Sequence, residues 1–205
     1  MLNAIYEEDF LGFSYGFRPG RGAHDALDAL MVALKSQKVN FIFDADIRSF
    51  FDTVSQKWLI RFLEHRIGDK RIIRLVQKWL KAGVLEDGVV SVSERGTGQG
   101  AVISPLLANI YLHYVLDLWA ERWRRREATG DMIIVRYADD FIVGFQREAD
   151  ARRGRHAQPV RGVLAIAQSG QDSPDRVRPL CGRTTRSAWA RKAGNLQLPR
   201  FYLHL

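Results

Sequence analysis

The stretch Arg136-Tyr-Ala-Asp-Asp-Phe-Ile-Val-Gly144 places two consecutive carboxylates between two short apolar runs. These runs, residues 132–135 and 141–145, are rich in β-forming side chains and predict a β-hairpin with both acids at its tip. Adjacent carboxylates repel each other, and a divalent cation relieves that repulsion, since paired hard oxygen ligands suit Mg²⁺ or Mn²⁺. A solvated polar turn is the simpler explanation of an isolated Asp-Asp pair. Residues elsewhere in the chain must therefore distinguish a polar turn from a metal site.

The composition is that of a globular protein without a membrane span. The 205 residues suffice for one domain with a core, or for part of a larger protein. Cys181 is the single cysteine, which excludes an intramolecular disulfide and a cysteine zinc cluster and favours a reducing, cytoplasmic location. No apolar run approaches the roughly 20 residues that a bilayer span needs, so we expect no membrane partner. The acidic N-terminus is unlike a signal peptide.

The net charge of +8 suggests a nucleic-acid partner, but its distribution weakens that argument. Residues 1–146 hold 19 basic and 19 acidic side chains, whereas residues 147–205 hold 12 basic and 4 acidic ones. The whole excess therefore lies in the C-terminal tail.

Periodicity and capping residues predict the order of the remaining elements. We expect a helix after Gly22, a strand over residues 39–47, helices opened by Ser55 and by Asp69 (the second closed by Gly83), a hairpin over residues 84–93, and a long helix opened by Ser104 and Pro105 that runs to about Trp123. This order predicts an α+β fold with helices on one face of an antiparallel sheet.

A third acid, Asp46, lies near the end of the strand expected over residues 39–47. Beside the acid hairpin it would complete a three-carboxylate site for two metal ions, which lie ~3.5–4 Å apart in phosphoryl-transfer sites. The simpler alternative is an edge-strand acid in Asp44-Ala-Asp46, and the residues alone do not separate the two.

Polar and aromatic residues elsewhere could complete such a site. The glycine-rich residues 96–100 precede a helix start and could offer backbone N–H groups to a phosphate, with Gln99 as a neutral polar contact. Asn109 lies on an apolar helix face. This position slightly favours a functional role over the role of a hydrogen-bonded amide in the core. Phe50 and Phe51 are either core residues or place one ring against a nucleotide sugar.

Four motifs occur in order with suitable spacing, and together they resemble the reverse transcriptase of bacterial group II introns. They are Tyr15-Gly-Phe-Arg-Pro-Gly-Arg21, Asp46-Ile-Arg-Ser-Phe-Phe-Asp52, Gly98-Gln-Gly-Ala-Val-Ile-Ser-Pro-Leu-Leu-Ala-Asn-Ile110 and Tyr137-Ala-Asp-Asp140. The resemblance implies the palm of a right-hand polymerase with part of the fingers and no thumb, over residues 1–153.

The resemblance also implies an activity. It is RNA-directed DNA synthesis, in which a deoxynucleoside triphosphate extends a DNA primer 3′-OH on an RNA template, in a protein that also helps its intron RNA splice and move. Asp46, Asp139 and Asp140 match the catalytic acids, which hold two Mg²⁺ ions or Mn²⁺ in their place.

Further residues match family positions beside the substrates. Phe51 matches the bulky residue that excludes a ribonucleotide 2′-OH, Gln99 and Gly100 match the loop beside the incoming nucleotide, and Tyr137 would lie by the primer end. Other motif residues match positions that are structural first: Asp52, Ser104, Pro105 and Asn109. Arg18 and Arg21 match the family's turn without an assigned role.

The chain departs from the family at both ends. Met1 lies only 14 residues before Tyr15, whereas the family's triphosphate-binding fingers begin earlier. After Arg153 the resemblance stops, and residues 154–205 are rich in Arg, Pro, Gly and Ser without apolar periodicity, which predicts a disordered basic tail. We therefore expect a truncated remnant with little activity; the alternative is a non-catalytic RNA-binding fragment of the intron protein.

A frameshift would explain the tail. Codons permitted by residues 168–184, read one nucleotide later, can encode Asn-Pro-Asp-Lys-Thr-Arg-Leu-Ile-Glu-Phe-Gly-Arg-Tyr-Ala, and residues 194–205 likewise permit Phe-Leu-Gly-Phe. Both segments resemble the missing family motifs in order and distance. Our hypothesis is a frameshift between about Arg153 and Val163; resequencing that finds one continuous frame encoding the stated tail would refute it.

Overall fold

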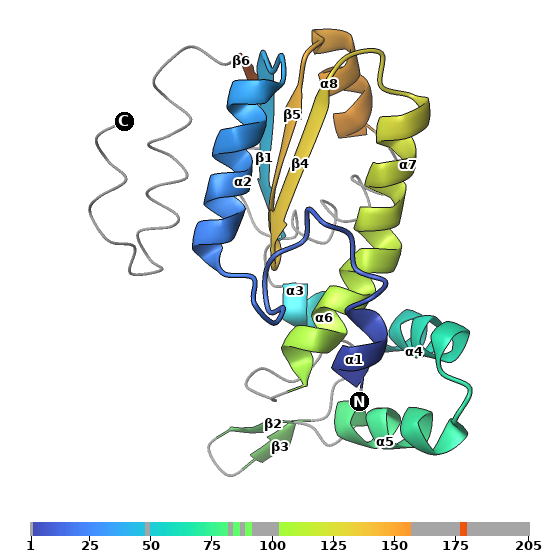
Figure 1. Cartoon of the computed structure of the whole chain (residues 1–205). Helices are drawn as coiled ribbons and strands as arrows, with labels where there is room; N and C mark the ends of the chain where they lie inside the picture. Colours follow the sequence, from blue (N-terminus) through green and yellow to red (C-terminus); the bar gives the residue numbers. More distant parts are fainter. Residues whose placement is uncertain are drawn as a thin grey trace.

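The computed structural model describes residues 2–47, 50–81, 84–86, 89–91, 103–156 and 177–179. Its elements, in chain order (Figure 1), are α1 (Leu2–Tyr6), α2 (Ala23–Ser36), β1 (Phe41–Asp46), α3 (Phe50–Thr53), α4 (Gln56–Arg66), α5 (Lys70–Lys81), β2 (Val84–Glu86), β3 (Val89–Ser91), α6 (Ser104–Leu112), the π-helix η1 (His113–Asp117), α7 (Leu118–Arg126), β4 (Met132–Tyr137), β5 (Asp140–Phe145), α8 (Glu148–His156) and β6 (Val177–Pro179). In the described part of the chain, every helix is too short or too polar to cross a membrane.

The main sheet has the strand order β4-β5-β1-β6, and each neighbouring pair is antiparallel. The predicted acid hairpin is confirmed as β4 and β5, with Asp139 in the turn and Asp140 as the first residue of β5. Strand β6 and the end of α8 fall within residues 154–205, most of which lie outside the described residues. The predicted disorder of that tail stays a prediction.

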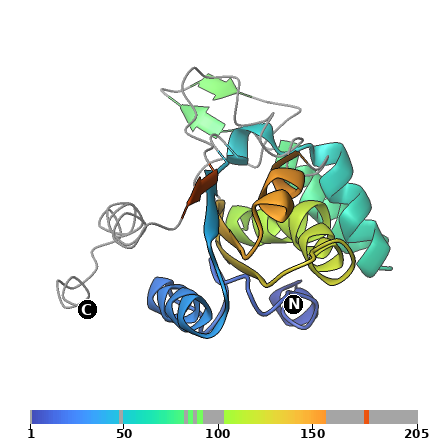
Figure 2. The same ribbon diagram turned by 90° about the horizontal axis from the view of Figure 1, so that it is seen from above.

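Helices cover both faces of this sheet, whereas the sequence predicted one covered face. Cluster residues Phe43, Ile134 and Phe141 pack on the side of α6 and α7, and alternate residues such as Ile133 and Ile142 pack with α2. Figure 2 shows α2 and the α6–α7 helices on opposite sides of the strands. The reason is visible in the strands, because continuous apolar runs leave neither face suited to water.

Local sequence signals predicted the starts of α4 and α5 and the hairpin that follows them. The Oγ of Ser55 accepts a hydrogen bond from the Trp58 N–H, as expected of the N-cap of α4. Helix α5 follows Asp69 as predicted, and its expected end at Gly83 lies outside the described residues. The expected hairpin over residues 84–93 is seen in β2 and β3.

The predicted long helix departs from expectation in two ways. Ser104 is its first helical residue, with Ile103 at the N-cap position. The helix is also interrupted by η1, so it consists of α6, a π-helical turn and α7.

Candidate catalytic centre

The sheet brings the three predicted acids to one end. In the β1–β5 register Asp46 lies opposite Asp140, and Asp139 precedes Asp140 in the turn. The Ile47 N–H donates to the Asp139 carbonyl oxygen at 3.4 Å, so the end of β1 is tied to the hairpin tip. Residues far apart in the sequence are therefore neighbours at this edge.

The donor chemistry of this edge fits a hard divalent cation. Asp139 and Asp140 are both half-buried, which leaves their carboxylates within reach of solvent. Carboxylate oxygens are the ligands that Mg²⁺ and Mn²⁺ prefer. Among the side chains that the structure describes, which do not include Asp46, no group of three His, Cys, Asp or Glu residues forms a metal site.

The turn at residues 138–139, which contains Asp139 and precedes Asp140, has an unusual backbone; we call it the acid turn. Ala138 has a φ of 55°, in the left-handed region that costs an L-residue about 1–2 kcal/mol. The N-terminal segment approaches this turn so closely that a Cβ on Gly16 would lie 2.2 Å from the Ala138 nitrogen. Only glycine fits at position 16, and the contact fixes the turn from one side.

A fully buried guanidinium fixes the same turn from the other side. Arg136, with 0% exposure, donates to both Asp117 carboxylate oxygens at 2.8 and 2.7 Å and to the Ala138 carbonyl oxygen at 2.8 Å. It also donates to Asn109 Oδ1 at 3.0 Å and to Ser14 Oγ at 2.6 Å. All five N–H donors are thereby used, the condition under which a buried charge is tolerated.

Asn109 is a satisfied core amide in this network. Its Oδ1 accepts from Arg136, and its Nδ2 donates to the Gly16 carbonyl oxygen at 2.6 Å. The residue pattern had slightly favoured a direct functional role, whereas the family resemblance indicated a structural one; the hydrogen bonds support the structural one. Asn109 links α6 to both segments that hold the acid turn.

Sequence reasoning missed the importance of Arg136, Asp117 and Ser14. The available signal was an arginine within the otherwise apolar strand of residues 132–137, because a buried arginine needs a partner. Asp117 ends the π-helix η1, and such irregular turns often occur at functional sites.

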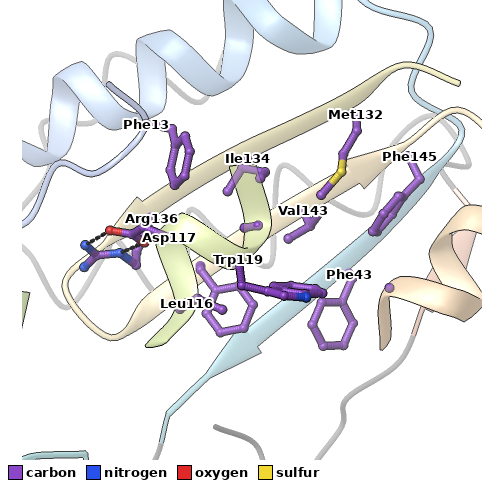
Figure 3. Close-up of a pocket in the computed structure, with 13 residues that line it drawn as sticks. Phe13, Phe43, Leu116, Asp117, Trp119, Met132, Ile134, Arg136, Val143 and Phe145 are labelled. Atoms are coloured by element: carbon purple, nitrogen blue, oxygen red, sulfur yellow. Dashed lines mark hydrogen bonds and ion pairs between the residues drawn. The ribbon is translucent and has the colours of Figure 1, made fainter. Parts of the chain in front are cut away.

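Behind the acid turn, a small apolar pocket lies between the sheet and α7 (Figure 3). Its walls include Phe13, Met132, Phe145 and Trp119, and the Arg136–Asp117 pair lies at one end. The pair thus separates the apolar interior from the turn that carries the acids.

Two of the predicted nucleotide and primer residues, Phe51 and Tyr137, follow β1 and end β4, respectively. Phe51 in α3 is half-buried, and its ring contacts Phe50 and Phe17 with centroids 5.7 and 6.5 Å away. Tyr137, the last residue of β4, packs on the α2 side of the sheet. Gln99 and Gly100 lie outside the described residues.

The two arginines of the N-terminal turn stabilise its shape. Buried Arg18 pairs with Glu7 at 2.6 Å and donates to the carbonyl oxygens of Leu11 and Ser14. Arg21 donates to the Gly12 carbonyl oxygen at 2.7 Å. Both hold the segment that presses Gly16 against the acid turn.

Known proteins resemble this chain in sequence and in fold. The family model described as reverse transcriptase (RNA-dependent DNA polymerase) matches residues 1–169, beyond the predicted limit at Arg153. The chain is 32% identical to protein YkfC of Escherichia coli over 197 residues, covering 80% of this chain and 50% of that protein. It is 39% identical to the group II intron-encoded protein LtrA of Lactococcus lactis over 122 residues, covering 58% of this chain and 20% of LtrA.

A third relative and a solved structure extend the comparison. A protein encoded in the cob intron of Schizosaccharomyces pombe is 42% identical over 113 residues, which cover 55% of this chain and 14% of that protein. The chain therefore spans half or less of these curated relatives. Telomerase of Candida albicans shares the fold, with a TM-score of 0.58 and 15% identity over 90% of this chain and 34% of the telomerase chain. The chain belongs to the reverse transcriptase family, and its relatives place it with the proteins encoded by group II introns.

Proposed function

We propose that this chain carries the catalytic acids of an RNA-directed DNA polymerase encoded by a group II intron. The polymerase would join a deoxynucleotide to the 3′-OH of a DNA primer on an RNA template, and would also bind its intron RNA. The observation that carries the proposal is the register of β1 and β5, in which Asp46 faces Asp140 beside Asp139.

Asp46, Asp139 and Asp140 would hold two Mg²⁺ ions, with Mn²⁺ as a substitute. When bound, the ions would neutralise phosphate charge and stabilise the attacking and leaving oxygens of the transfer. The contribution of the chain itself is positional, because Gly16 and Arg136 fix the turn from which Asp139 and Asp140 project.

Phe51 would lie against the sugar of the incoming nucleotide and exclude a ribonucleotide 2′-OH. Its place directly after the β1 end supports this role, as does its half-buried ring. Tyr137 would lie by the primer end, and Gln99 with Gly100 would line the nucleotide site. Phe51→Ala should then raise incorporation of UTP relative to dTTP on a poly-rA template.

A primer-extension assay tests the main proposal. The purified chain is supplied with poly-rA, oligo-dT, dTTP and Mg²⁺. We expect it to extend the oligo-dT primer, and we expect EDTA to stop the extension. Asp139→Ala and Asp140→Ala should each abolish extension, whereas Asp28→Ala, which removes an exposed acid from α2, should leave it unchanged. Equal extension by wild type and Asp139→Ala would overturn the assignment.

A non-catalytic RNA-binding role is the second candidate. It is favoured by the exposed basic side chains of α5, which include Lys70, Arg74 and Lys78. RNA binding without extension by the wild-type chain, under conditions where a full-length relative extends the primer, would support it.

A further inference from the structure

Helices α4 and α5 hold an uneven share of the charge in the folded part of the chain. Residues 55–81 contain 8 basic and 2 acidic side chains, whereas the other residues up to 146 contain 11 basic and 17 acidic ones. The neutral total over residues 1–146 therefore conceals one strongly basic segment beside an acidic remainder.

All eight of these basic side chains are exposed. Among the described residues, only two form ion pairs, Arg66 with Asp9 and Arg71 with Asp69. Arg61 lies over the Trp58 ring at 4.9 Å from the ring centroid. Five of the eight cations thus form neither an ion pair nor a contact with an aromatic ring within the part of the chain that the structure describes: Lys57, Lys70, Arg74, Lys78 and Lys81.

On α5 the cations lie next to exposed apolar side chains. At 3.6 residues per turn, its five basic residues occupy an arc of about 100°. Leu75 and Trp79, which are 45% and 46% exposed, occupy the adjoining arc, and Trp58 on α4 is 50% exposed. The buried residues Ile73, Val76 and Leu80 hold the opposite side of α5 against the core. We call the exposed side chains of Trp58, Lys70, Arg74, Leu75, Lys78 and Trp79 the α4–α5 face.

We propose that the α4–α5 face binds a strand of single-stranded nucleic acid, with its phosphates on the cations and its bases against the exposed indoles. Cations beside aromatic rings are the combination that proteins use for single strands, because unpaired bases expose faces for stacking. A duplex hides those base faces, so it would use the cations alone. In Figure 1 α4 and α5 lie beside α6 at the end of the molecule that holds the N-terminus.

This proposal is separate from polymerase chemistry, and its test needs neither metal ions nor nucleotides. Fluorescence anisotropy in EDTA measures binding of a labelled RNA of about 20 nucleotides, longer than a typical site of ~4–16 nucleotides. A DNA of the same sequence and the matching duplex form the other two arms. Tighter binding of RNA than of DNA would show that the face contacts the 2′-OH. Equal binding of RNA and DNA would show that it contacts only the phosphates and bases that both share. In either case the proposal requires weaker binding of the duplex.

Three variants separate stacking from charge. Trp79→Ala should weaken binding of the single strand at least about fivefold and leave the salt dependence unchanged. Arg74→Gln with Lys78→Gln should lower the slope of log affinity against log salt by about 1.4, and Lys78→Gln alone by about 0.7. The basic tail is identical in every variant, so a difference in affinity between variants is assigned to the α4–α5 face.

Matched controls use exposed residues elsewhere. Arg124→Gln with Arg125→Gln removes two cations that pair with Glu121, and Val32→Ala truncates an apolar residue that is 65% exposed. Both should change affinity by less than about twofold, because surface side chains outside the binding face contribute little. Circular dichroism and thermal melting confirm that each variant is folded.

Duplex binding as tight as single-strand binding would overturn the proposal, and so would unchanged affinity in Trp79→Ala. Two further results would also overturn it. One is an equal loss of affinity in the Arg74/Lys78 and Arg124/Arg125 double variants, which would mean binding by overall charge alone. The other is light scattering that shows a dimer, together with α5 variants that become monomers but bind nucleic acid as tightly as wild type; the face would then be an interface between copies.

Discussion

Arg136 and Arg74 carry the same guanidinium group in opposite settings. Arg136 is fully buried beside the acid turn, with every N–H donor hydrogen-bonded, whereas Arg74 is exposed on α5 without an ion-pair partner among the described residues. Burial makes Arg136 a structural element, because its removal would leave the Asp117 carboxylate buried in the core without a counter-charge. Exposure leaves the second available for a ligand.

The largest effect that tests this contrast is the loss of the buried cation. Arg136→Met should lower the free energy of unfolding by about 3–5 kcal/mol, because Asp117 is left buried without a counter-charge. Urea denaturation measures the change. The same substitution at exposed Arg125, also paired with a carboxylate, should cost at most about 1 kcal/mol. Similar costs at both positions would remove the distinction between the two settings.

The close approach at the acid turn gives the next effect. Gly16→Ala should cost up to about 3 kcal/mol, since its Cβ would meet backbone atoms of Ala138 at 2.2 and 2.8 Å. Gly12→Ala, four residues earlier, is the control, because no atom lies within 4 Å of its added Cβ. Thermal melting of both variants gives the comparison, and an unchanged midpoint in Gly16→Ala would contradict the packing described for the turn.

Removing one partner of Arg136 should have a smaller effect. Ser14→Ala leaves one N–H of the guanidinium without its 2.6 Å acceptor, at a cost of about 1–2 kcal/mol. Ser36→Ala, at an exposed helix end, should be nearly neutral. A neutral Ser14→Ala would indicate that water replaces the hydroxyl at this position.

The smallest effect is a pH dependence of stability from His113. Burial lowers the pKa of His113 below its ordinary value, partly offset by the nearby Asp117 carboxylate. The unfolded chain then binds the proton more readily than the folded one, so stability is full above pH ~6.5 and falls as the pH drops below it. Chemical denaturation at pH 7.5 and 5.5 measures this. His113→Leu should reduce the difference, and exposed His24→Leu should preserve it.

Much of the fold was predictable because its signals are local. The runs of residues 132–135 and 141–145 predicted the hairpin, and Ser55 predicted the start of α4 through its side-chain cap. The second covered face of the sheet was not predicted, although the continuous apolar runs carried that information. The π-helix was missed because apolar periodicity does not distinguish it from an α-helix.

The candidate site likewise combines local motifs, which the sequence reveals, with long-range contacts, which it does not. The three acids could be proposed from the sequence because each lies in a short motif, and the register of β1 and β5 brings the ends of their strands together. The network that holds the turn at Ala138, next to Asp139, joins Ser14, Gly16, Asn109, Asp117 and Arg136. These residues are distant in the sequence, and their pairing depends on tertiary packing rather than on any local pattern.

The π-helical turn η1 has a consequence for inherited changes in the gene. A π-turn closes its hydrogen bonds over one residue more than an α-turn does. Loss of a single codon within residues 113–116 would therefore remove the extra residue and leave an ordinary, uninterrupted helix, with α6 and α7 in nearly the same relative orientation. Asp117 would keep its place beside Asn109, where both side chains accept hydrogen bonds from Arg136. Loss of a second codon would rotate α7 by about 100° relative to α6, carry Asp117 away from Asn109 and release the acid turn.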